Sequence, residues 1–339
     1  MKIGQRVGET NAGRKRRRNE DSYVCDPPLF AVADGMGGAQ AGEVASSLAA
    51  AALKERGEGD EQGDGERRVA ELIQEANRRV HQRAVDDESA SGMGTTMTIA
   101  LFHPDGSVSI GHVGDSRAYL DRDGRLDQLT DDHSLVAELV RRGELSPEEA
   151  EVHPQRSVIT RALGTDPDVD VDTFTVQAID GDIFLLCSDG LTTMVDVETI
   201  AAVIDRNRHD LHAATRALIR EANERGGDDN ITAVLFEVAE GEPDDEDTGE
   251  IIIDPRERSS EDTLHPEPSA GLVEGDTSIV SVEDVRNALA AEAEAEDETH
   301  EDEEGEKPHA SIGQRVLAAI LIVALAVLIV VLVVKGLAR

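Results

Sequence analysis

Short apolar runs bounded by turn residues recur along the first 238 residues of the chain. The runs are rich in Val, Ile, Leu and Thr, which is typical of β-strands. The dipeptides Asp105-Gly106 and Asp123-Gly124 separate neighbouring runs and favour tight hairpin turns. We therefore predict strands at 29–33, 95–102, 107–113, 118–122, 183–187 and 231–238.

Other segments have apolar residues at spacings of three and four, the pattern of an amphipathic α-helix. The predicted strands come in adjacent hairpins, and the helical segments come in pairs. This order favours antiparallel α+β layers over alternating βαβ units. Helices are predicted at 42–56, 66–85, 135–142, 197–205 and 211–225.

The pattern changes after residue 238, where acidic residues far outnumber basic ones and apolar residues become sparse. Such a segment buries too little apolar surface to become ordered. We predict a folded domain over 1–238 and an acidic disordered linker over 239–314. Within the linker, 281–291 carries a capping-box pattern and predicts a short helix, either transient or docking to a partner.

Residues 316–334 are uninterrupted apolar residues, about the length that crosses a hydrocarbon core. We predict a C-terminal transmembrane helix over 315–335 and a short tail over 336–339. The N-terminus has no apolar stretch typical of a secretory signal. The two cysteines fit a reducing compartment. The predicted localisation is therefore the membrane, through a single-pass anchor with the folded domain in the cytoplasm.

The chain holds 71 acidic and 33 basic residues, a formal net charge of −38. Nucleic-acid phosphates would be repelled by this charge, so we expect no nucleic-acid partner. The same charge favours the binding of cations.

Several acidic residues stand where apolar runs end or in glycine-rich turns. Carboxylates brought together repel one another unless a cation neutralises them. Because no His or Cys cluster accompanies them, an all-oxygen ligand set selects Mg²⁺ or Mn²⁺. A single Asp-Gly is usually a turn, and only the set indicates a site. Its members are Glu20, Asp21, Asp34, Asp115, Asp189 and Asp229.

Two divalent ions held a few ångströms apart would bind and deprotonate a water molecule. An arginine near the same acids indicates an anionic substrate. Arg16, four residues before Glu20, is a candidate for a forked contact with a phosphate.

Read together, these segments resemble the metal-dependent protein phosphatases, the PPM or type 2C serine/threonine phosphatases. The resemblance covers roughly residues 3 to 238. It rests on several long motifs that occur in the family order. They are GxxRxxNED at 13–21, ADGMGG at 33–38, GMGTT at 92–96, HVGDSRAYL at 112–120, TRALG at 160–164, LLCSDGL at 185–191 and DNIT at 229–232.

The resemblance implies a four-layer α-β-β-α sandwich, in which helix pairs flank two antiparallel sheets. It also implies two Mn²⁺ or Mg²⁺ ions, with a weaker third site. The segment 133–164 matches the flap over the active site. By the resemblance, Asp34 bridges the two ions, Asp189 and Asp229 complete one site, Glu20 and the Gly35 carbonyl serve the other, and Asp115 joins Asp189 in the third.

The resemblance further implies hydrolysis of phosphoserine and phosphothreonine on proteins, opposing a Ser/Thr protein kinase. Asp21 would act on a metal-bound water, and Arg16 would bind the phosphate. Met36 stands where eukaryotic members carry a histidine proposed as the general acid, so the proton donor is left open. The alternative is a catalytically silent phosphoprotein-binding scaffold or signalling regulator of the same fold.

Overall fold

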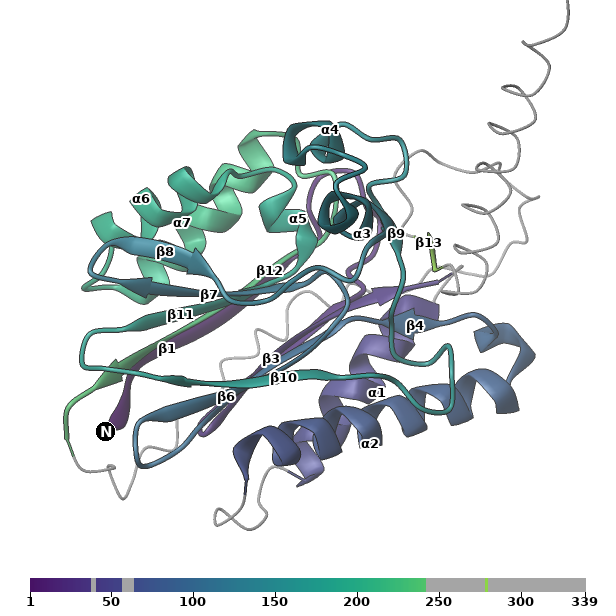
Figure 1. Cartoon of the computed structure of the whole chain (residues 1–339), viewed down its shortest axis with the longest axis horizontal. Helices are drawn as coiled ribbons and strands as arrows, with labels where there is room; N and C mark the ends of the chain where they lie inside the picture. Colours follow the sequence, from purple (N-terminus) through teal and green to yellow (C-terminus); the bar gives the residue numbers. More distant parts are fainter. Residues whose placement is uncertain (38–40, 57–63, 242–277, 280–339) are drawn as a thin grey trace, which may run out of the picture. The chain divides into compact units, whose positions relative to one another are not determined.

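The structure is a computed structural model that describes residues 1–37, 41–56, 64–241 and 278–279. Antiparallel pairing builds two sheets within these residues (Figure 1). One sheet has the order β1 (Lys2–Asn11), β12 (Ile231–Ala239), β11 (Ile183–Cys187), β7 (Arg117–Arg122) and β8 (Arg125–Gln128). The other has the order β10 (Asp172–Gln177), β6 (Ser107–Val113), β5 (Met97–Phe102), β3 (Leu29–Met36) and β2 (Asp21–Asp26).

Shorter elements complete the sheets. The strand β4 (Gly94–Thr95) pairs with the end of β3. The strand β9 (Val158–Ile159) pairs in parallel with β13 (Ser278–Ile279). Short helical segments lie outside the two main helix pairs. They are the 3-10 turn Glu88–Ala90, α3 (Leu135–Arg142), α4 (Pro147–Glu151) and α5 (Asp189–Thr192).

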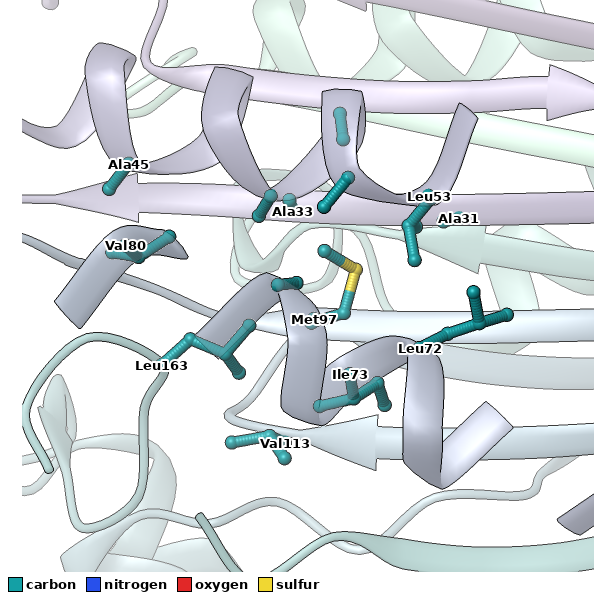
Figure 2. Packing of buried hydrophobic residues seen from close by; sticks show 14 of the residues in the cluster. Ala31, Ala33, Ala45, Leu53, Leu72, Ile73, Val80, Met97, Val113 and Leu163 are labelled. Carbon is teal, nitrogen blue, oxygen red and sulfur yellow. The ribbon is translucent and has the colours of Figure 1, made fainter. Parts of the chain in front are cut away.

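Helix pairs cover the outer faces of the two sheets. The helices α1 (Ala41–Arg56) and α2 (Gly65–Asp86) share a buried cluster with β3, β5 and β6. Figure 2 shows Ala45 and Leu53 of α1 with Leu72 and Ile73 of α2 around Met97. The helices α6 (Val197–Arg206) and α7 (Leu211–Glu224) pack in the same way on β11 and β12. The predicted α+β class, with helices flanking two antiparallel sheets, is confirmed.

A third cluster lies between the sheets and contains three stacked phenylalanines. The ring of Phe236 stands 4.0 Å from that of Phe30 in the opposite sheet and 4.9 Å from that of Phe184 on the neighbouring strand. All three side chains are fully buried. The three rings join the two sheets within a larger aliphatic cluster, and each ring buries far more area than an alanine or valine.

The strands that sequence patterns miss lie mostly at sheet edges. The strands β1, β2, β8 and β10 end the two sheet orders. In β1, only Val7 is fully buried, because the edge presents little apolar surface to the core. Such strands lack the continuous apolar run that marks a central strand. The predicted hairpin at 123–124 is confirmed, since Arg122 pairs with Arg125 around it.

No helix in the ranges 1–37, 41–56 and 64–241 is long and apolar enough to cross a bilayer. By this finding the predicted localisation, a single-pass membrane protein with a cytoplasmic domain, is wrong. The apolar segment 315–335 on which it rested lies outside the described residues, as do the linker from 242 to 277 and the predicted helix at 281–291.

Replacing Phe236 by alanine should lower the free energy of unfolding by about 3–5 kcal/mol, because the ring is fully buried between the sheets. Denaturant unfolding followed by circular dichroism measures this value. Val85 on α2 is 66% exposed, so V85A is the matched control and should stay within about 0.5 kcal/mol of wild type. A loss under about 1 kcal/mol for F236A would contradict the role of the stack.

Candidate metal centre

Asp34 and Asp21 face each other at one end of the second sheet. The two residues are register partners in the β2–β3 ladder. Hydroxyl groups fix the backbone of Asp34, since its N–H donates to Thr96 Oγ1 at 2.9 Å and its carbonyl accepts from Thr95 Oγ1 at 2.8 Å. The strand β3 therefore extends beyond the Asp34 carboxylate, since the backbone N–H and carbonyl of Asp34 are both hydrogen-bonded.

Asp189 and Asp229 come from neighbouring strands of the first sheet. Asp189 begins α5 and is separated from the end of the buried strand β11 by Ser188, and Asp229 lies two residues before the first residue of β12. Because β11 and β12 are antiparallel neighbours, the end of one lies beside the start of the other. A Cβ at Gly190 would collide with the Asn230 carbonyl and stand 3.4 Å from the Asp229 Cβ. The two turns pack against each other through that glycine.

Glu20 and the Gly35 carbonyl converge on a single point beside α1. A Cβ built on Gly42 would stand 2.7 Å from the Gly35 oxygen and 2.9 Å from the Glu20 carboxyl carbon. Only a glycine leaves this space open. The Gly35 amide also donates to the Glu20 carbonyl at 3.1 Å. The structure therefore brings together the two groups that the resemblance assigns to one metal ion.

The acidic residues of the set are close enough to perturb one another. Burial raises the pKa of Asp34 well above its usual range, and the charges of Asp21, Asp189 and Asp229 raise it further. Burial, followed by the charge of Asp229, raises the pKa of Asp189 to about 6. The pKa of Asp115 rises through burial first and the charge of Asp189 second. A cation in their midst would reverse these shifts.

Two buried carboxylate oxygens in this cluster have no hydrogen-bond partner among the described residues, Asp21 Oδ1 and Asp189 Oδ1. A buried acceptor without a donor is costly, and a cation or a water would satisfy it. Among the residues that the structure describes, no group of three or more acidic, Cys or His side chains is arranged closely enough to hold a metal ion. The donor chemistry fits hard cations, and the ligand assignment stays a prediction.

Arg16 lies beside the cluster, where its side chain pairs with Asp229. Its Nη2 contacts Asp229 Oδ2 at 2.8 Å, and its side chain is 26% exposed. Asn230 fastens the surrounding loop, since its amide donates to the carbonyls of Ala12 at 3.0 Å and Arg18 at 2.9 Å. Its Oδ1 accepts from the Glu20 N–H at 2.7 Å. The guanidinium therefore stands beside the predicted metal ligands.

The segment 133–164 is tied to the centre at both ends. Gly114 N–H donates to His133 Nδ1 at 3.0 Å, which leaves the proton on Nε2 facing Asp172 Oδ2 at 3.1 Å. Burial lowers the pKa of His133, in keeping with a neutral ring. At the other end, Leu163 exchanges two backbone hydrogen bonds with Thr95.

Met36 packs beneath this segment rather than into a polar site. Its side chain is 4% exposed and clusters with Ile159 and Ala162. A thioether carries no proton to donate. The side chain at this position therefore contacts the flap and does not supply a general acid.

Sequence reasoning assigned no role to several side chains that support the centre. They are polar residues within the quoted motifs, so the motifs themselves were the available signal. The missed residues are Thr95, Thr96, Ser188, Asn230 and Thr232.

Comparison with known proteins places these features in a family. The family model "Protein phosphatase 2C" matches residues 14–235. The serine/threonine phosphatase stp of Listeria monocytogenes is 42% identical over 237 residues, which cover 67% of this chain and 93% of that protein. PstP of Mycobacterium tuberculosis is 39% identical over 234 residues, 69% of this chain and 45% of that protein.

Solved structures agree. The crystal structure of Mycobacterium tuberculosis PstP/Ppp superposes with a TM-score of 0.67 at 38% identity, covering 70% of this chain and all of that one. A structure of the PstP catalytic domain with two manganese ions has a TM-score of 0.63 at 36% identity, covering 70% and 99%. The resemblance predicted from the motifs is thereby confirmed, and this chain belongs to the protein phosphatase 2C family.

Proposed function

We propose that this protein is a metal-dependent protein serine/threonine phosphatase that hydrolyses phosphoserine and phosphothreonine. Relatives named serine/threonine phosphatases support the activity. The observation that carries the proposal is the convergence of buried carboxylates from both sheets beside Arg16. Such a centre suits an anionic substrate held by divalent cations.

The residues present fit two Mn²⁺ or Mg²⁺ ions. As the family resemblance implies, Asp34, whose pKa is raised by burial and by the charges of neighbouring aspartates, would serve both ions, with Asp189 and Asp229 on one ion and Glu20 and the Gly35 carbonyl on the other. Asp115 with Asp189 would form the weaker third site. Ions bound there supply positive charge for phosphoryl oxygens and acidity for a water.

The protein's own groups then bind the substrate and accept a proton. Arg16 pairs with Asp229 and is 26% exposed, and it would hold the phosphate by its fork of donors. Asp21 Oδ1 is a buried acceptor without a partner in the described part of the chain, which suits it to take a proton from the attacking water. Attack in line on phosphorus needs no covalent intermediate with the enzyme.

The proposed partners are phosphorylated proteins, including those modified by a Ser/Thr protein kinase whose action the enzyme would reverse. The alternative is a silent scaffold that binds phosphoproteins without cleaving them. Loss of a metal-binding aspartate would favour it, but Asp34, Asp189 and Asp229 are all present.

The purified full chain should release phosphate from a phosphothreonine peptide only when Mn²⁺ is added. D34N should abolish release, because the amide no longer carries the charge that bridges two cations. The matched control is D127N, which removes an exposed carboxylate of β8 and should leave the rate unchanged. A wild type that binds the peptide without releasing phosphate would favour the scaffold.

Arg16→Ala should lower kcat/KM about 10- to 100-fold at saturating Mn²⁺, chiefly through a higher KM, because charge-assisted hydrogen bonds to the phosphate are lost. Arg16→Lys should lose less, since it keeps the charge but not the fork. Steady-state kinetics on the same peptide measure both. Arg17 is an exposed neighbour, so R17A is the control. Equal losses in R16A and R17A would refute the assignment.

Metal removal should make the melting temperature fall as the pH rises. The pKa of Asp21 is raised to about 7 and that of Asp189 to about 6, so the folded protein binds more protons than the unfolded chain between pH about 4 and 7. The stability associated with these protons is complete at low pH and is lost as they dissociate.

Differential scanning calorimetry in EDTA should therefore give a lower Tm at pH about 7.5 than at about 5, and excess Mn²⁺ should restore it. The D34N variant should show a shallower pH dependence, because one buried charge is gone. A wild-type Tm that depends on neither pH nor Mn²⁺ would contradict the claim that the buried carboxylates repel one another without a cation.

A further inference from the structure

We infer that the hydroxyls of Ser188 and Thr232 position the Asp21 carboxylate for the reaction. Both donate to the same oxygen, Asp21 Oδ2, from Ser188 Oγ at 2.8 Å and from Thr232 Oγ1 at 2.5 Å. Both side chains are fully buried. Two donors fill one oxygen and fix the plane of the carboxylate, so that Oδ1 remains the oxygen available to the centre. The inference rests on the proposed role of Asp21.

The direction of the Thr232 hydroxyl follows from a chain of hydrogen bonds. The Asn19 side-chain amide donates to Thr10 Oγ1 at 2.8 Å, and Thr10 Oγ1 lies 2.6 Å from Thr232 Oγ1. The Asn19 amide is oriented by its own Oδ1, which accepts from the Asp21 N–H at 3.2 Å. Since the amide nitrogen can only donate, the hydroxyl protons of Thr10 and Thr232 are directed onward to Asp21.

Ser188 is oriented in the same manner by a backbone group. The N–H of Thr232 donates to Ser188 Oγ at 3.0 Å, which occupies an acceptor position of that hydroxyl. The Ser188 proton is then directed to Asp21 Oδ2, with the Asn230 carbonyl as a weaker contact at 3.3 Å. Each hydroxyl that donates to Asp21 thus itself accepts a hydrogen bond from another group.

The arrangement depends on strand register. Thr10 and Thr232 are direct partners in the β1–β12 ladder, the position where cross-strand threonines form hydrogen bonds. Ser188 follows β11 and bonds the Thr232 carbonyl through its own N–H at 3.1 Å. The first sheet therefore holds a carboxylate that belongs to β2 in the second sheet. Ser188 and Thr232 are positioning residues, because they act through Asp21.

Thr232→Val removes the donor with little change in side-chain volume. We expect kcat for the phosphothreonine peptide to fall about 10- to 100-fold, the usual effect of a lost supporting hydrogen bond at a metal site. KM and the calorimetric Kd for Mn²⁺ should stay near wild type, because Asp21 is not a proposed ligand. Thr232→Ser, which restores the hydroxyl, should recover most of kcat, and T10V should lose less than T232V.

Thr215 provides the matched control. Its hydroxyl is equally buried but bonds the Leu211 carbonyl within α7 at 2.8 Å, away from the centre. T215V should change Tm without lowering kcat. In crystals grown with Mn²⁺, the Asp21 carboxylate of T232V should be rotated from its wild-type plane, whereas that of T215V should not.

Three results would overturn the inference: a kcat loss in T232V no greater than in T215V, no recovery in T232S, or a Mn²⁺ affinity that weakens in step with kcat. An inactive wild type would instead refute the proposed function. The orientation of Asp21 in the crystals tests the positioning role separately, since it needs no turnover.

Discussion

The mutual repulsion of buried carboxylates is the constraint on which this structure depends. Asp21, Asp34 and Asp189 stand where burial, and after it the charges of neighbouring aspartates, raise the pKa of each. Burying like charges without a counterion costs several kcal/mol for each ion. The backbone of Asp34 is hydrogen-bonded to Thr95 and Thr96, which leaves its carboxylate to be neutralised by what it binds.

The acids belong to different sheets, so the centre exists only where the sheets pack together. Asp21 and Asp34 come from β2 and β3, and Asp189 and Asp229 flank β11 and β12. The chain has five phenylalanines, and three of them form the inter-sheet stack. Aliphatic side chains fill the space around that stack. Packing between the sheets thereby sets the separation of the carboxylates that face each other across them.

The central strands were predictable because apolar runs mark them, and Asp34, Asp115 and Asp189 drew attention because each stands where such a run stops. The edge strands β1 and β2 leave no such mark, yet they carry Thr10 and Asp21. The supporting hydroxyls were missed for a related reason. Thr232 and Asp21 are 211 residues apart, and a lone threonine in a strand indicates only a strand. The membrane prediction rested on the apolar run at 316–334, and no helix in the described part of the chain is long and apolar enough to cross a bilayer.

The segment 133–164 contacts the strands that carry the candidate metal centre at two places. Leu163 packs into the cluster beneath α1 and α2 while its backbone pairs with Thr95, whose hydroxyl bonds the Asp34 carbonyl (Figure 2). Met36, two residues beyond Asp34, contacts Ile159 of the flap. The segment 133–164 is therefore packed against the end of β3 that presents Asp34, so the fold positions the two together.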